Sequence, residues 1–126
     1  MTIRGITLDT GALIAIERRT PRATQLLELA KQRLAILSVP VPVISEWWRG
    51  RTDVRDRILS AVNIEPLPVP VAKAAGEALA KVRGSTAIDA MVMAFAAARG
   101  DVVFTSDIRD LERLRTFFPA VHVLAC

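Results

Sequence analysis

Apolar residues along this chain occur in two kinds of run: short ones, and longer ones with helical spacing. The short runs predict strands over residues 3–8, 33–37, 63–67, 101–105 and 121–124. The segments between them predict helices over residues 10–16, 20–31, 38–48, 53–61, 71–83, 87–99 and 108–115. This alternation predicts a three-layer α/β/α fold, with helices on both faces of a short central parallel sheet of about five strands.

Capping residues and prolines indicate where several of these helices begin. Thr20 and Thr52 each precede a helical segment and are expected N-caps. Pro40 and Pro42 are tolerated in a helix only within its first turn. We therefore expect the third helix to begin at Ser38, directly behind the second strand.

The helix predicted after residue 86 carries one charge in an otherwise apolar sequence. Between residues 87 and 98 every position is apolar or alanine except Asp89. A helix that is apolar all round is typical of a domain interior, where an unpaired carboxylate costs on the order of several kcal/mol. The chain then ends the helix at Gly100 and runs through a short buried strand to Asp107. Two carboxylates in such positions indicate a divalent metal ion between them.

Four acidic residues from separate segments are expected at one edge of the sheet. Asp9 and Asp107 each follow the end of a predicted strand, which is the edge where α/β sheets bind ligands. Asp89 lies in the first turn of a helix that starts at the same edge. Glu46 lies a turn or two inside the helix after the second strand, where a longer side chain can reach inward. The topology therefore gathers four carboxylates.

Converging carboxylates repel one another and raise each other's pKa values unless a cation lies between them. No histidine or cysteine accompanies these acids, and an all-oxygen donor set favours Mg²⁺ or Mn²⁺ over zinc. Mg²⁺ keeps several waters and accepts phosphate oxygens, so a phosphodiester is the expected substrate. The expected reaction is in-line attack by metal-activated water.

Length and composition set further limits. The 126 residues, 52% of them hydrophobic, are expected to form one domain over 1–126. No apolar run approaches the ~20 residues of a membrane helix, and no export signal is recognisable. The single cysteine, Cys126, excludes an intrachain disulfide and a cysteine-rich zinc site. We expect a cytoplasmic protein without membrane contact.

The charge balance favours a polyanionic partner. Lysine and arginine number 17 against 13 acidic residues, a formal net charge of +4. Arginines near the predicted ligand-binding edge are candidates for contacts with the phosphates of such a partner. They are Arg18, Arg49, Arg51 and Arg109, with Arg19 and Arg113 close to them in sequence.

Four motifs together resemble the PIN-domain ribonucleases, and the size and pattern resemble the VapC toxins of bacterial toxin–antitoxin pairs. The motifs occupy residues 8–13 (LDTGAL), 44–50 (ISEWWRG), 87–94 (AIDAMVMA) and 103–107 (VFTSD). The resemblance implies a PIN-like fold and Mg²⁺- or Mn²⁺-dependent RNA cleavage. It also implies a homodimer that forms a hetero-oligomer with a small cognate antitoxin, whose C-terminal segment occupies a basic, apolar groove.

The resemblance also assigns roles to particular residues. Thr105 matches the family's hydroxyl residue near the last acid, and the hydroxyl of Thr10 is a second supporting group. The chain departs from the family at Gly11, where relatives often carry serine or asparagine. The matching acidic quartet, implied as catalytic residues and metal ligands, is Asp9, Glu46, Asp89 and Asp107.

Most of these acids also have a purely structural interpretation. Asp9 is placed to cap the helix that follows it, and Thr86-x-x-Asp89 fits a capping box. Asp107 and Asp110 are first-turn acids of the kind that a helix dipole favours.

Two other functions are compatible with an α/β chain of this length. One is a catalytically weak or inactive PIN-type module that binds RNA or protein. The other is a phosphoacceptor receiver-like module, which needs paired acids after the first strand and an aspartate after the third. Here the first strand ends in the single Asp9 and the third in Leu67-Pro68, which disfavours the receiver.

Overall fold

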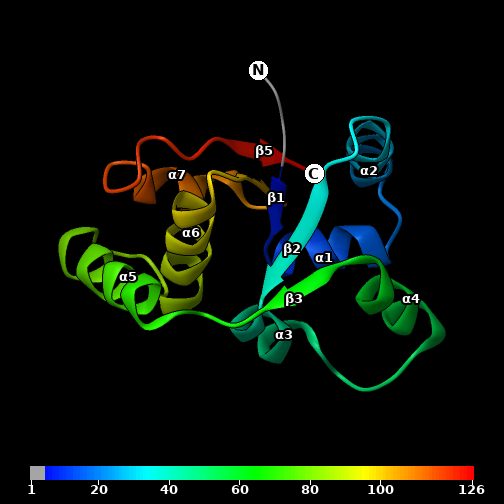
Figure 1. The fold of residues 1–126 in the computed structure, drawn as a ribbon, viewed down its shortest axis with the longest axis horizontal. Helices are drawn as coiled ribbons and strands as arrows, with labels where there is room; N and C mark the ends of the chain where they lie inside the picture. The colour runs from blue at the N-terminus through cyan, green and yellow to red at the C-terminus, as the bar shows by residue number, and fades with distance from the viewer. Residues whose placement is uncertain (1–4) are drawn as a thin grey trace.

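The computed structural model describes residues 5–126, and its centre is a five-stranded sheet (Figure 1). All strand pairs are parallel, in the order β3-β2-β1-β4-β5. This confirms the predicted parallel α/β sheet. The strands are β1 (Gly5–Leu8), β2 (Ile36–Pro40), β3 (Asn63–Glu65), β4 (Val102–Thr105) and β5 (Val123–Ala125). Residues 3 and 4 of the predicted first strand lie outside the described residues.

Helices cover both faces of this sheet. Figure 1 shows α5, α6 and α7 on one side and α1, α2 and α4 on the other, while α3 packs against both α1 and α6. Among residues 5–126 no helix is long and apolar enough to cross a membrane. The helices are α1 (Thr10–Glu17), α2 (Pro21–Gln32), α3 (Val41–Trp47), α4 (Asp53–Ala61), α5 (Val69–Lys81), α6 (Ala87–Arg99) and α7 (Ile108–Leu114).

The core lies between the central strands and the helices α1 and α6. Leu8, Val39 and Val103 are fully buried in three adjacent strands, and Leu13 and Met93 are fully buried on α1 and α6. Strands covered on both faces are apolar almost throughout, which explains the unbroken apolar runs in the sequence. Each such side chain contributes roughly 1.5–3 kcal/mol of transfer free energy.

The second strand lies three residues further along the chain than expected. Leu34 turns the chain with a φ of 54°, and β2 then runs on through Ser38 to Pro40. Ser38 pairs with both β1 and β3, so the helix that carries Glu46 begins at Val41. The expectation that Ser38 starts a helix was wrong. Pro40, the extended N-cap, marks the end of the strand.

Other boundaries agree more closely. The hydroxyls of Thr20, Thr52 and Thr86 each accept a hydrogen bond from the amide three residues on, at 3.1–3.2 Å. Gly100 ends α6 in the left-handed region, with a φ of 72°. The prediction for the last strand, 121–124, was wrong at its start by two residues, because β5 is Val123–Ala125.

A buried polar network lies at the amino end of the sheet. Asp101, whose side chain is 5% exposed, accepts hydrogen bonds from the Thr7 hydroxyl at 2.9 Å and from Arg99 Nε at 3.2 Å. The Arg99 guanidinium also donates to the Ser38 hydroxyl at 3.0 Å. A Cβ on Gly5 would overlap Asp101 Oδ1, so glycine is needed there for close approach. The network ties the start of β4 to the interior of β1 and β2.

We expect Asp101→Ala to lower the free energy of unfolding by about 2–4 kcal/mol, because Arg99 and Thr7 lose a buried acceptor. Asp56→Ala is the matched control, since Asp56 pairs at 2.5 Å with an Arg51 side chain that is 79% exposed. That surface pair is expected to cost less than about 1 kcal/mol. Urea unfolding near neutral pH measures both, and equal losses would contradict the assignment.

Candidate functional site

Asp9 is buried where β1 passes into α1. Its residue is 6% exposed, and its Oδ1 accepts a hydrogen bond from the Ala12 amide at 2.8 Å. The fully buried Thr105 at the end of β4 also hydrogen-bonds the Asp9 carboxylate. Asp9 therefore does cap α1, as its structural interpretation required, and it also faces the end of the neighbouring strand.

Asp107 approaches the same place from the other side. The Asp107 amide donates to the Thr105 hydroxyl at 3.0 Å, so Thr105 contacts both acids. Asp107 is exposed, and its carboxylate makes no capping bond to α7. Asp107 therefore occupies the N-cap position rather than the first turn that its structural interpretation assumed, and its carboxylate makes no bond to the helix.

Asp89 and Glu46 complete the group. Asp89 is half-buried in the first turn of α6, where its amide donates to the Thr86 hydroxyl at 3.2 Å. Glu46 is exposed on α3, and its Oε1 accepts a hydrogen bond from the Thr10 hydroxyl. Thr10 thus links the start of α1 to α3.

The electrostatics show that these carboxylates are neighbours. Burial raises the pKa of Asp9 to about 6; hydrogen bonds from Thr105 and Ala12 oppose this, and the charges of Asp89 and Glu46 add to it. Burial also raises the pKa of Asp89, a hydrogen bond from Thr86 lowers it, and the charges of Asp110, Glu46 and Asp107 raise it further. Charge therefore couples Asp9 with Asp89 and Glu46, and couples Asp89 with Glu46 and Asp107.

Asp110 borders this group and was given a structural role by the sequence. Its charge raises the pKa of Asp89, while Arg113 pairs with it at 3.6 Å. Asp110 lies in the first turn of α7, directly after the N-cap position that Asp107 occupies, and this closeness in sequence was the signal for it.

The donor set fits a hard divalent cation. Most nearby groups are oxygen donors, namely the carboxylates and the hydroxyls of Thr10 and Thr105. The expectation that no cysteine accompanies the acids was wrong, because the Cys126 thiol lies close enough to Asp9 to feel its charge. Among residues 5–126 no three acidic, histidine or cysteine side chains stand close enough to hold a metal as they are. Mg²⁺ commonly uses one or two carboxylates and completes its shell with water, which these residues allow. A cation would also relieve the repulsion that raises both pKa values.

The candidate RNA-binding arginines differ in their distance from these acids. Arg109 lies two residues after Asp107 and is exposed. Arg49 and Arg51 follow α3, and Arg51 is engaged by Asp56. Arg18 caps the opposite end of α1 from Asp9, about 12 Å along the helix axis.

Arg22 is a further cation near the site that the sequence did not indicate. Its Nε donates to the Ala125 carbonyl at 2.9 Å, and the Cys126 amide donates to the Thr105 carbonyl at 2.8 Å. Burial and the charge of Asp9 raise the pKa of the Cys126 thiol to about 11, while Arg22 lowers it. The contact joins residues 103 apart, so no local signal reveals it.

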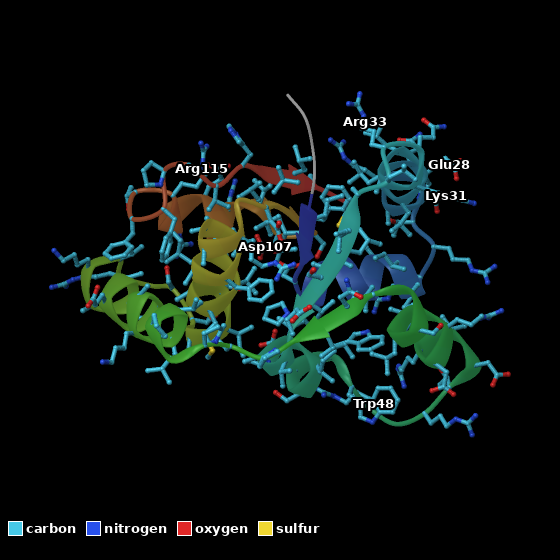
Figure 2. The ribbon with its side chains drawn as sticks, in the orientation of Figure 1. Glu28, Lys31, Arg33, Trp48, Asp107 and Arg115 are labelled. Carbon is cyan, nitrogen blue, oxygen red and sulfur yellow. The ribbon has the colours of Figure 1, made fainter. Side chains whose placement is uncertain are left out.

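An apolar groove of about 430 Å³ runs between α1, α2, β2 and α4; we call it the α1–α4 groove. Arg19, Lys31 and Arg57 lie among its lining residues with a single acid, Glu28. Figure 2 shows Glu28 and Lys31 on α2, well away from Asp107. The apolar lining residues are Ile16, Leu27, Leu37, Val54, Ile58, Ala61 and Val62.

The two tryptophans differ in burial, since Trp47 is the last residue of α3 and Trp48 follows it with an extended backbone. Trp47 is 3% exposed, and its Nε1 donates to Glu17 at 3.0 Å. Trp48 is half-buried and packs edge to face on Trp47 with ring centroids 6.0 Å apart. Figure 2 shows Trp48 beside the connection between α3 and α4, far from Asp107. Trp47 therefore anchors the helix that presents Glu46.

Solved structures share this architecture. VapBC2 from Rickettsia felis, bound to a promoter DNA fragment, has a TM-score of 0.77 at 16% identity and covers 97% of this chain and 98% of its own. DNA-bound VapBC from Salmonella typhimurium has a TM-score of 0.72 at 18% identity, with 98% of each chain covered. The Sarcin-Ricin loop cleaving toxin VapC20 of Mycobacterium tuberculosis has 0.64 at 19%, with 82% and 90% covered.

At such identities these likenesses show the fold. No curated protein matches the chain. A family model described as the PIN domain, however, matches residues 6–116, a stretch that includes all four acids. The chain therefore belongs to the PIN domain family.

Proposed function

We propose that this chain is a Mg²⁺- or Mn²⁺-dependent endoribonuclease that acts as the toxin of a toxin–antitoxin pair. The observation that carries the proposal is the buried Asp9, whose pKa is raised by burial and by Asp89 and Glu46. A buried carboxylate among other carboxylates is typical of a site that holds a cation. The Sarcin-Ricin loop cleaving toxin among the similar structures supports RNA as the substrate.

Each residue then has a definite role. Asp9 and Asp89 hold the metal, with Asp107 and Glu46 binding it directly or through its waters. Thr105 fixes the Asp9 carboxylate, and Thr10 holds Glu46. The bound ion supplies a Lewis acid and lowers the pKa of a water molecule. Arg109, exposed two residues after Asp107, and Arg22, which bonds the Ala125 carbonyl, are the cations that would contact RNA phosphates.

The proposed antitoxin segment occupies the α1–α4 groove. Such a segment needs apolar side chains for the floor and acidic ones opposite Arg19, Lys31 and Arg57. Similar structures from Rickettsia felis and Salmonella typhimurium are VapBC complexes, which supports a partner protein for this chain. The homodimer that the resemblance implies belongs to the same proposal.

One observation favours the second candidate, a PIN-type module that binds RNA without cleaving it: no three described side chains are already arranged around a metal. The two functions differ in their dependence on metal. A nuclease loses turnover in EDTA, whereas a binding module retains RNA regardless of EDTA.

We expect Asp9→Asn and Asp89→Asn each to lower RNA cleavage with Mn²⁺ at least about 100-fold, because each removes a metal-binding charge. Asp53→Asn is the matched control, since Asp53 is exposed on α4 and should change cleavage less than about twofold. Cleavage of a labelled RNA under single-turnover conditions measures all three. Unchanged cleavage in both site variants would remove the acids from the mechanism.

Asp9 also predicts a pH-dependent stability. Its pKa is raised in the fold from 3.8 to about 6, so the folded protein binds this proton more tightly than the unfolded chain. Stability in EDTA should fall as pH rises through this window, by up to about 3 kcal/mol.

Asp9→Asn keeps a good N-cap and removes this charge. We expect the variant to be more stable than the wild type by about 1–3 kcal/mol in EDTA near pH 7.5, and equal to it near pH 3.5. Urea unfolding at both pH values tests this, and added Mn²⁺ should stabilise only the wild type. A variant no more stable near pH 7.5 would argue against an uncompensated carboxylate.

We expect Arg57→Glu to weaken binding of the proposed cognate antitoxin about tenfold or more, since it reverses a charge at the α1–α4 groove. RNA cleavage without antitoxin should not change. Arg33→Glu, an equal reversal at the exposed end of α2 (Figure 2), is the control. Calorimetric titration measures both, and equal weakening would place the antitoxin elsewhere.

A further inference from the structure

Gly11 lies in the first turn of α1, two residues after Asp9, and is overlaid by Ser106. A Cβ at Gly11 would overlap the Ser106 hydroxyl oxygen and lie 3.2 Å from the Ser106 amide nitrogen and 3.3 Å from its Cβ. The hydroxyl can rotate away, but the nitrogen and Cβ are also in tight contact, and the backbone of Ser106 would have to shift by a few tenths of an ångström to relieve it. Gly11 is helical, so this glycine serves close approach rather than an unusual φ.

Close approach also accounts for Gly5, where a Cβ would overlap Asp101 Oδ1, but it does not account for the remaining glycines. A Cβ at Gly76, on the exposed face of α5, would meet nothing within 4 Å. Gly50, Gly84 and Gly100 have positive φ, so their backbone conformation accounts for them.

Ser106 lies in the chain between Thr105, which contacts Asp9, and Asp107. Thr105, before it, hydrogen-bonds Asp9 and accepts the amide of Asp107 at 3.0 Å. Asp107, after it, is exposed and makes no capping bond of its own. The backbone position of Asp107 relative to Asp9 therefore depends on how closely residue 106 approaches the start of α1.

We propose that Ser106 is a positioning residue, its hydroxymethyl group seated on the bare Cα of Gly11 so that Asp107 is held at the distance from Asp9 that the metal requires. The proposal rests on the proposed function and names a residue pair that sets its geometry. It makes a specific claim: one side chain fits between the two segments, and two do not.

This claim is tested by moving the hydroxymethyl group from one segment to the other. Gly11→Ser places two such groups in one space and pushes the Asp107 backbone outward. Ser106→Gly leaves the space empty. The double variant Gly11→Ser/Ser106→Gly restores a single hydroxymethyl group, now carried by α1. The control is Gly76→Ser, the same substitution where a Cβ meets nothing.

The full chain and these four variants are compared in Mn²⁺ affinity by calorimetry, in RNA cleavage, and in melting temperature with EDTA. We expect Gly11→Ser to weaken Mn²⁺ binding and lower kcat about tenfold, and Ser106→Gly to do so about threefold. The double variant should return to within about threefold of the wild type. Gly76→Ser should match the wild type in both Mn²⁺ affinity and cleavage.

Two results would overturn the proposal: a Gly11→Ser variant that binds Mn²⁺ as the wild type does, or a double variant no better than Gly11→Ser. Melting temperatures separate a stability loss from a positioning effect, since Mn²⁺ affinities are compared where every variant is folded. If the wild type binds Mn²⁺ but cleaves no RNA, the proposed function fails. Recovery of Mn²⁺ affinity in the double variant would still support the Gly11–Ser106 pair.

Discussion

The structure depends on one unfavourable placement, the buried carboxylate of Asp9 at the junction of β1 and α1. Two donors, the Ala12 amide and Thr105, hold it there. They do not offset its burial, since its pKa remains raised to about 6. A position that served only to cap a helix would not need this burial, because capping aspartates work well in solvent. The excess negative charge at this edge of the sheet is the basis of the metal site that we propose.

Much of the fold follows from the sequence because local rules decide it. The apolar helix α6, the capping threonines and Gly100 all act through neighbours within four residues, and the structure confirms them. The start of the helix at Ser38 was wrong for the opposite reason. Ser38 is buried in a strand because Arg99, 61 positions away, supplies its hydrogen bond. Sequence pattern alone cannot reveal a polar residue that a distant partner makes acceptable.

Some residues of the candidate site could likewise be predicted from the sequence, and others could not. The acids could be placed because the ends of parallel strands share one edge, which requires only topology. The residues that contact the neighbourhood of these acids could not be predicted from the sequence. Arg22 reaches it through the carbonyl of Ala125, and Ser106 through a missing side chain at Gly11. Both depend on packing distances that have no periodic signature.

At each end of the sheet a glycine allows another side chain to approach closely, but the two side chains differ in charge. At the amino end, Gly5 makes room for Asp101, whose carboxylate has two donors including a cation. At the carboxyl end, Gly11 makes room for Ser106, which adds a hydroxyl but no positive charge. A neutral group can set spacing without compensating the acids beside it. The amino end is therefore electrostatically complete and stabilises the sheet, whereas the carboxyl end keeps its negative charge for a ligand.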